Sequence, residues 1–274
     1  MVVGQLNKIL ALFLLVIFSS QNLYAVEFKG KFEQGSFILG KTKAGSHVTV
    51  DKKKIRVSKD GYFAFGLGRD RKNDVVIKIF KDGKLEVFEK KVFKRKYKIQ
   101  KIDGLEKKHV TPPPEVYERI KKDNILIGKA RSIDTAYDFF KDKFIYPVDK
   151  YIITGVYGSQ RILNGKPRRP HYGIDFHAPE GTLVKAMMDG EVILAEKDMY
   201  FTGGTLIFDH GHGISTLFMH MKDINVKVGQ KIKQGEVVGS LGQTGRATGP
   251  HLDIRLNWFD VKLDPATILN INLK

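Results

Sequence analysis

The C-terminal half of this chain carries the pattern that most restricts its fold. From residue 146 onward, short apolar runs are separated by glycines. Alternation of apolar and polar residues is typical of β-strands, and glycines between such runs mark turns. No helix is predicted in this half before the "PATILNIN" segment near the end of the chain. We therefore predict a mainly β protein, with an antiparallel β barrel or sandwich at residues 146–274.

Two segments of this half resemble each other. "GTLVKAMMDGEV" begins at Gly181 and "GQKIKQGEVV" begins at Gly229. Each joins a glycine to a branched apolar residue three positions later and then reaches Gly-Glu-Val, although the inner spacings differ. A repeated unit of this kind fits a barrel or sandwich assembled from two related halves.

The region before residue 146 divides into two parts. Residues 26–100 contain short strand-like runs, including "VVIKIFKDGKLEVFEK", whose Asp82-Gly83 pair predicts a hairpin turn. Closely spaced short strands predict a small β-sandwich domain. In residues 101–145, three prolines lead into Glu115, and the apolar positions that follow suggest an interrupted helix. We interpret this part as a partly helical linker.

The first 25 residues have the character of a secretory signal peptide. They contain one lysine, Lys8, an apolar run from Ile9 to Phe18, and a polar stretch that ends at Ala25. This run is shorter than the ~20 residues that a membrane span needs. An uncleaved N-terminal anchor is the alternative, because Leu23 makes the cleavage site imperfect. We expect an exported protein of the periplasm or cell envelope, with no membrane span in the mature chain.

The charge is concentrated in the first part of the expected mature chain. Residues 26–145 carry 31 Lys and Arg against 17 Asp and Glu, whereas residues 146–274 carry 15 against 13. Nucleic acid is the usual partner of a basic region. Because we expect export, we predict no nucleic-acid partner and favour anionic envelope polymers, lipid headgroups or a simply solvated lysine-rich surface. The chain has no cysteine, so thiolate metal sites and thiol catalysis are excluded.

The histidines gather in the nearly neutral C-terminal half, where six of the eight lie between residues 171 and 251. In "HYGIDFH", His171 stands four residues before Asp175, and in "GPHLDIR" the residues His251, Asp253 and Arg255 occupy alternate positions. Alternate positions of a strand share one face. Imidazole and carboxylate groups are the ligands that zinc takes when thiolates are absent. A single His-x-x-x-Asp pair is a weak signal when it stands alone.

Three separated segments are together more specific. "HYGIDFHAPEGTLVKAMMDGEV", "DHGHGISTLFMHM" and "VKVGQKIKQGEVVGSLGQTGRATGPHLDIRL" resemble, in order and approximate spacing, the lysostaphin-like (LytM-type) zinc metalloendopeptidases that cut cell-wall peptides. The resemblance covers about residues 146–269 and implies the duplicated hybrid motif form of β barrel. The regions before it also look like the small β domain and connector that precede such peptidases in some envelope proteins.

The resemblance implies roles for particular residues. It makes His171 and Asp175 ligands of Zn²⁺, and it makes His220 and His251 the non-ligand histidines that handle the proton and the developing oxyanion. The remaining histidines of this half fall outside the matched ligand positions, and "DHGHG" is interpreted as a tight turn.

The chain departs from the family pattern at the third ligand. The family has the second histidine of a His-x-His pair there, whereas this chain has Asp253, followed by Arg255 where the family tends to have glutamate. An aspartate oxygen is a competent zinc ligand. Arg255, on the same strand face, could hydrogen-bond Asp253 and return some positive charge to the site.

Two functions are compatible with these features. The first is a zinc-dependent endopeptidase that cleaves peptide cross-links or stems of peptidoglycan during cell-wall remodelling. The second is a catalytically inactive envelope scaffold of the same fold, which recruits or activates another wall hydrolase. The expected partners are peptidoglycan peptides and, for the second function above all, other envelope proteins.

Overall fold

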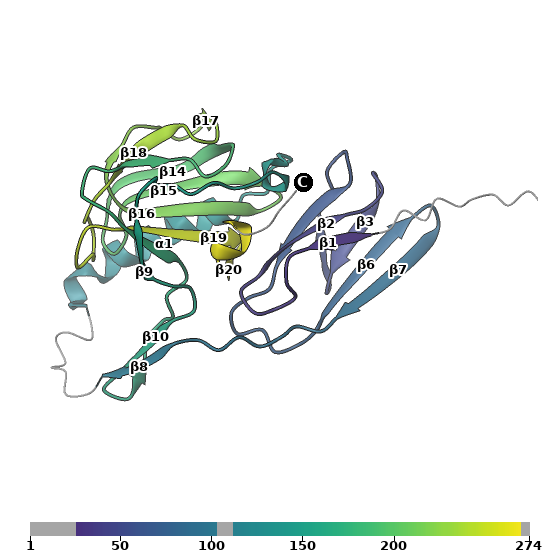
Figure 1. Cartoon of the computed structure of the whole chain (residues 1–274), viewed down its shortest axis with the longest axis horizontal. Helices are drawn as coiled ribbons and strands as arrows, with labels where there is room; N and C mark the ends of the chain where they lie inside the picture. Colours follow the sequence, from purple (N-terminus) through teal and green to yellow (C-terminus); the bar gives the residue numbers. More distant parts are fainter. Residues whose placement is uncertain (1–25, 103–111, 270–274) are drawn as a thin grey trace, which may run out of the picture.

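The structure is a computed structural model that describes residues 26–102 and 112–269. The predicted signal peptide lies outside the described residues. Two lobes lie side by side in Figure 1, one built mainly from the first third of the chain and one from the second half. None of the helices in the described ranges combines the length and apolar character that crossing a bilayer requires.

The N-terminal unit, residues 26–98, consists of two small antiparallel sheets. One has the strand order β1-β2-β5 and the other the order β4-β3-β6-β7. Their strands are β1 (Glu27–Lys29), β2 (Phe37–Lys41), β3 (His47–Val50), β4 (Lys53–Ile55), β5 (Tyr62–Gly66), β6 (Val75–Lys81) and β7 (Lys84–Lys90). Apolar side chains of both sheets, such as Phe63 and Ile77, are fully buried in one continuous hydrophobic core.

The predicted hairpin of the N-terminal unit is confirmed. Lys81 pairs with Lys84, which leaves Asp82 and Gly83 as the two turn residues between β6 and β7. Both residues have positive φ angles, 50° and 74°. This is the conformation that a two-residue type I′ turn requires, and Asp-Gly adopts it readily.

A connecting segment links the lobes. Strand β8 (Ile99–Ile102) crosses the predicted boundary at residue 100 and pairs in parallel with β10 of the C-terminal lobe. After it come the short helix η2 (Pro114–Val116), the helix α1 (Tyr117–Arg131) and the short helix η3 (Phe139–Lys141). The prolines therefore precede a helix, and the helical character is interrupted, as the sequence predicts.

The C-terminal domain, residues 146–269, is built around a ten-stranded sheet. Its main path runs β17-β14-β15-β16-β19-β12-β9, with β13, β18 and β20 paired at its sides. The strands of this domain are β9 (Ile152–Gly155), β10 (Gln160–Leu163), β11 (Lys166–Pro167), β12 (Ile174–His177), β13 (Leu183–Lys185), β14 (Gly190–Met199), β15 (Gly203–Gly211), β16 (Ile214–Ile224), β17 (Lys231–Ile232), β18 (Val237–Leu241), β19 (Leu252–Trp258) and β20 (Val261–Leu263). One short helix, α2 (Ala266–Leu269), follows the last strand.

Strands of the two resembling segments pair with each other. β13, from the first segment, pairs antiparallel with β18, which begins at the end of the second. β17, from the second segment, pairs antiparallel with β14, which begins in the first. Each segment therefore completes the pairing of the other, which agrees with a fold assembled from two related halves.

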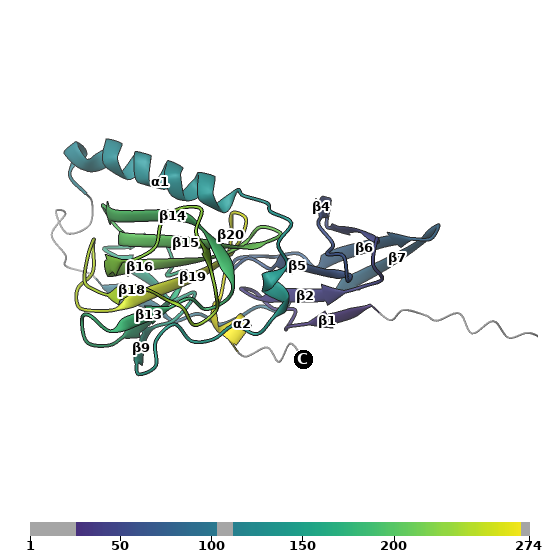
Figure 2. The same ribbon diagram turned by 90° about the horizontal axis from the view of Figure 1, so that it is seen from above.

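Helix α1 covers one face of the large sheet. Figure 2 shows it lying along β14 and β15. Its residues Ile127 and Ala130 pack against buried side chains of β14, β15 and β16, among them Ile207 and Leu217. The opposite face packs into the main core. The sheet is thus buried on both faces over its central strands, which makes it a rigid support for anything attached to it.

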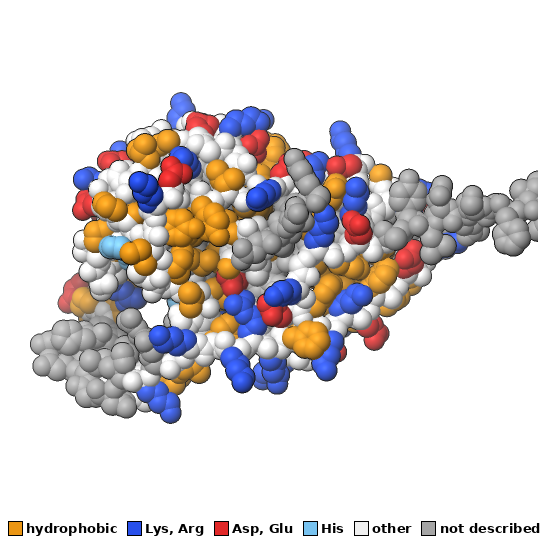
Figure 3. Space-filling model, in the orientation of Figure 1, with side chains coloured by type: hydrophobic (Ala, Val, Ile, Leu, Met, Phe, Trp, Pro, Cys, Tyr) orange, Lys and Arg blue, Asp and Glu red, His pale blue; other side chains and the backbone are white. Residues whose placement is uncertain are grey.

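The N-terminal unit contacts β19, β20 and the residue that follows them. Phe65 lies edge-on to Trp258 with ring centroids 6.5 Å apart, and a Cβ at Gly66 would collide with Leu263. Arg95 donates a 2.8 Å hydrogen bond to the carboxylate of the buried Asp264. On the face in Figure 3, Lys and Arg side chains are interspersed with Asp and Glu. The basic residues on this face therefore look like a solvated surface.

We expect Phe218→Ala to unfold the protein more easily. Phe218 is fully buried in β16 and meets Phe208 edge-on with ring centroids 5.2 Å apart. Its removal should lower the free energy of unfolding by about 3–5 kcal/mol. Leu85→Ala on β7, where the side chain is 58% exposed, should change it by about 0.5 kcal/mol or less. Urea denaturation checks both values, and equal losses would contradict the assignment of the core.

Candidate metal centre

Two neighbouring strands bring His171, Asp175 and Asp253 together. β12 and β19 are antiparallel, and Asp175 stands directly opposite Asp253 in their register. His171 precedes β12, and its Nε2 atom lies 3.2 Å from Oδ1 of Asp175, while its Nδ1 atom lies 3.9 Å from Oδ2 of Asp253. One potential ligand atom from each residue lies within 4.8 Å of the others. The three groups are therefore close enough to share one ion.

Two atoms of this cluster lack hydrogen-bond partners. Nε2 of His171 and Oδ1 of Asp175 are buried, and neither has a partner in hydrogen-bonding geometry. Buried polar atoms are almost always paired, and leaving one unpaired costs about 1–3 kcal/mol. A divalent cation would satisfy both atoms at once. The donor set of one imidazole and two carboxylates suits zinc, so the residues present fit such an ion.

Two glycines make room for the carboxylates. A Cβ at Gly155, on β9, would collide with the Asp175 carboxylate. A Cβ at Gly173 would collide with the Asp253 carboxylate and approach the backbone oxygen of Ile254 within 2.6 Å. Gly173 lies inside the sequence motif of His171 and Asp175, whereas Gly155 lies on a strand with no sequence signal that links it to the site.

Arg255 holds the Asp253 carboxylate from one side. Its Nη2 and Nε atoms donate to Oδ2 and Oδ1 at 2.9 and 3.4 Å. Burial alone would raise the pKa of Asp253, but the positive charges of Arg255 and His171 outweigh burial and lower it. Burial likewise would lower the pKa of His171, yet its contact with Asp175 and the charge of Asp253 raise it. The carboxylate at position 253 is therefore ionised at neutral pH.

His220 and His251 form a second pair beside the cluster. Their ring centroids are 4.6 Å apart. Nδ1 of His220 donates to the carbonyl of Thr244, and Nδ1 of His251 donates to the carbonyl of Gly249, both at 2.8 Å. A ring whose Nδ1 donates in this way offers Nε2 as its second nitrogen. Nε2 of His251 lies 4.0 Å from Oδ1 of Asp175, so this ring borders the cluster.

The backbone at His220 is unusual. Its φ angle is 63°, in the left-handed region that non-glycine residues rarely adopt. The backbone N–H of His220 donates to the carbonyl of Thr202 at 2.8 Å instead of continuing the regular ladder of β16. Burial lowers the pKa of His220, which keeps its ring neutral. Strained backbone of this kind tends to occur at functional sites.

The other histidines of this domain lie outside the cluster. Nδ1 of His177 contacts the carbonyl of Pro250 at 2.7 Å on the exposed end of β12. His210 is buried in β15, where it bonds the carbonyl of Asp189 and the hydroxyl of Thr216, both at 2.8 Å. Both rings have structural contacts of their own.

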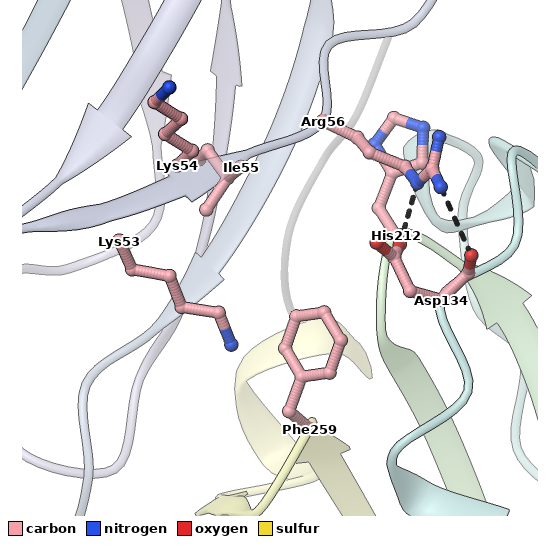
Figure 4. A pocket seen from close by; sticks show the side chains of 7 residues that line it. All are labelled: Lys53, Lys54, Ile55, Arg56, Asp134, His212 and Phe259. Carbon is pink, nitrogen blue, oxygen red and sulfur yellow. Dashed lines mark hydrogen bonds and ion pairs between the residues drawn. The ribbon is translucent and has the colours of Figure 1, made fainter.

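His212 belongs to the predicted tight turn. Its φ angle of 53° and that of 76° at Gly213 form the turn between β15 and β16. In Figure 4 it lies beside Arg56 and Asp134 in a pocket of about 380 Å³. The lining residues of this pocket come from both lobes: Lys53, Lys54, Ile55, Arg56, Asp134, His212 and Phe259. The pocket lies at the junction of the lobes and contains no residue of the metal cluster.

Comparison with known proteins finds similarity to peptidases. Residues 169–265 match Peptidase family M23. The C-terminal domain therefore contains a segment that matches an M23 peptidase domain. A solved structure of a proposed peptidase M23 from Pseudomonas aeruginosa resembles the chain with a TM-score of 0.56 at 25% identity, covering 89% of this chain and 93% of that one. The resemblance to M23 peptidases and the mainly β fold expected from the sequence are confirmed.

Curated relatives match only part of this chain and part of their own length. The peptidoglycan DD-endopeptidase ShyA of Vibrio cholerae is 39% identical over 113 residues, which make up 40% of this chain and 26% of that protein. The cell division protein DipM of Caulobacter vibrioides is 30% identical over 168 residues, or 58% of this chain and 26% of that protein. The chain thus spans about a quarter of the length of these two relatives.

We expect the M23 domain to become less stable in acid because of His210. Burial lowers the pKa of this histidine from 6.5 to about 4. Between these values the unfolded chain binds a proton that the folded chain excludes, so stability falls as the pH drops from 6.5 to 4. The loss from this group reaches about 3 kcal/mol at pH 4.

Urea denaturation at several pH values, together with an NMR titration of the ring, measures this effect. His210→Asn carries a neutral amide donor in place of the imidazole N–H, and it should lose this share of the acid sensitivity. An unchanged pH dependence in this variant would contradict the assignment to His210.

Proposed function

We propose that this protein is a zinc-dependent endopeptidase that cleaves peptide cross-links or stems of peptidoglycan in the cell envelope. The observation that carries the proposal is the cluster of His171, Asp175 and Asp253, with two unpartnered buried atoms, directly beside the paired rings of His220 and His251. The match to Peptidase family M23 and a relative named as a peptidoglycan DD-endopeptidase support the choice of reaction and substrate.

His171, Asp175 and Asp253 would hold the ion. A bound Zn²⁺ would act as a Lewis acid that activates water and polarises the scissile carbonyl. Two carboxylates balance the charge of the ion, whereas the pattern expected from the family would leave one positive charge. Arg255, which bonds Asp253, adds a positive charge to the surroundings and withdraws electron density from that carboxylate. It thereby offsets part of the extra negative charge.

His220 and His251 would move the protons. Their Nδ1 atoms are committed to backbone carbonyls, so each ring offers Nε2 for the reaction. One ring accepts the proton of the attacking water as its oxygen bonds to the peptide carbon. The C–N bond then breaks, and a protonated ring returns the proton to the leaving amine. The neighbouring ring, after it has taken a second proton from solvent at Nε2, can donate a hydrogen bond to the developing oxyanion.

A single feature favours the alternative of a catalytically inactive scaffold. Both carboxylate oxygens of Asp253 already accept hydrogen bonds from Arg255. Such a pair could fill the third position without any ion. A chain of this kind would recruit or activate another wall hydrolase, and other envelope proteins would then be its partners. Measurement of zinc binding separates the two functions.

We further propose export to the periplasm or cell envelope, because the proposed substrate is found there. The first 25 residues, with the character of a signal peptide, support this location.

We expect metal-free protein to take up one zinc ion per chain, and we expect Asp253→Ala and Asp175→Ala to lose it. Removing one carboxylate leaves too few donors for tight binding. His177→Ala is the matched control, because this histidine is exposed, bonds a backbone carbonyl and is not one of the three clustered residues. Elemental analysis after zinc addition and dialysis measures the content. Absence of zinc in the wild-type chain would favour the scaffold.

We expect His220→Ala to retain zinc but to release muropeptides from purified sacculi about 10²–10⁴ times more slowly. The ring is not among the three ligand residues, yet its Nε2 atom is free for proton transfer. Mass spectrometry of the digest gives both the rate and the bond that is cleaved. Wild-type activity in this variant would refute the proton-transfer role of His220.

A further inference from the structure

The loop before β10 holds the backbone of His171. The N–H of His171 donates to the carbonyl of Ser159 at 2.8 Å, and its carbonyl accepts from the N–H of Gly158 at 2.7 Å. Both backbone groups of this histidine are therefore bonded to two successive residues. A shift of residues 158–159 must move the backbone of His171, and with it the imidazole that borders Asp175 and Asp253.

Arg69 of the N-terminal unit holds this loop. Its Nε and Nη2 atoms both donate to the carbonyl of Gly158, at 3.0 and 2.7 Å. The residue is only 8% exposed, so these are buried hydrogen bonds from a charged donor, the stronger kind. They connect parts of the chain that are 89 residues apart. The carbonyl of Gly158 therefore receives its donors from the other lobe.

Tyr97 fixes both partners of this contact. The guanidinium carbon of Arg69 lies 4.3 Å from the centroid of the Tyr97 ring, as in a cation–π pair. The same ring covers Gly158, whose φ angle is +84°, and would collide with a Cβ there. Only glycine combines this backbone conformation with so close an approach. The ring therefore sets the position of the guanidinium and of the peptide it binds.

Tyr157 anchors the loop from its other side. It is buried, and its hydroxyl donates to the carbonyl of Lys262 at 2.9 Å. Gly35 of the N-terminal unit leaves room for the ring, because a Cβ there would approach it within 2.7 Å. The loop is thus clamped between the two lobes at the residues that bond the backbone of His171.

We propose that Arg69 is a positioning residue of the metal centre. By holding Gly158, it keeps the backbone of His171 where the imidazole can meet Asp175 and Asp253. Through this residue, the N-terminal unit contributes to the geometry of the metal centre. This inference rests on the proposed function, because it assumes that His171 binds a metal ion.

The competing role for Arg69 is purely structural. Loss of its side chain leaves the buried carbonyl of Gly158 without these donors, which lowers stability in either case. A structural role alone leaves the zinc affinity of the folded protein unchanged. A positioning role weakens it, as changes in groups that orient metal ligands do, typically by about 10–100-fold. Zinc affinity therefore distinguishes the two roles where stability does not.

The test compares full-length wild type with Arg69→Ala, Arg69→Lys and Arg71→Ala. Arg71 is the matched control, because its guanidinium bonds only Asp51, Asn73 and Asp74 within the N-terminal unit. Zinc dissociation constants come from competition with a chromophoric chelator, at a temperature where circular dichroism shows every variant folded. We expect Arg69→Ala to bind zinc about tenfold more weakly, Arg69→Lys to be intermediate, and Arg71→Ala to match wild type.

A cobalt spectrum gives a second readout. Co²⁺ in the site should show d–d bands that shift in Arg69→Ala and stay unchanged in Arg71→Ala, because only the first variant alters the ligand geometry. Equal zinc affinity and equal spectra in wild type and Arg69→Ala would overturn this inference alone. Absence of zinc binding in wild type would overturn the proposed function and this inference together. Should Arg69→Ala not fold, Arg69→Lys decides by the same two measurements.

Discussion

Two carboxylates stand directly opposite each other on adjacent strands, and the surrounding structure compensates for their repulsion. Asp175 and Asp253 occupy partner positions of β12 and β19, where like charges are destabilising. His171 and Arg255 contribute positive charge or hydrogen bonds, but an unpartnered oxygen of Asp175 remains. The strand register that aligns the carboxylates therefore also brings together the residues that we propose as metal ligands.

Different parts of the domain position different residues of the site. β12 and β19 fix the carboxylates, whereas loop carbonyls orient the rings of His220 and His251 through their Nδ1 atoms. His171 belongs to neither group, because its backbone depends on a loop that Arg69 clamps from the other lobe. The loop that supports His171 is therefore itself held by contacts from the N-terminal unit.

Features that depend on residues adjacent in the sequence could be predicted from the sequence. Asp82-Gly83 indicated its hairpin because the turn conformation depends on those two residues alone. The β architecture could be predicted because apolar and polar residues alternate over runs as long as a strand. The parallel pairing of β8 with β10 and the bonds from Arg69 to Gly158 join distant segments, and no local pattern encodes such contacts. The role of Gly155 could not be predicted for the same reason. Only the pairing of β9 with β12 places this residue against Asp175, where a side chain would collide with the carboxylate.

The pairing of strands between the two halves of the C-terminal domain has a consequence for how the chain folds. Among the described residues, β13 pairs with β18 alone and β17 pairs with β14 alone. Neither half forms a complete sheet without the other, and pairings between distant segments close slowly because of the entropy of the intervening chain. A growing chain that lacks β18 and β19 has no partner for β13 and no Asp253, so it cannot assemble the cluster. The order of synthesis itself delays the assembly of the cluster until nearly the whole chain is present.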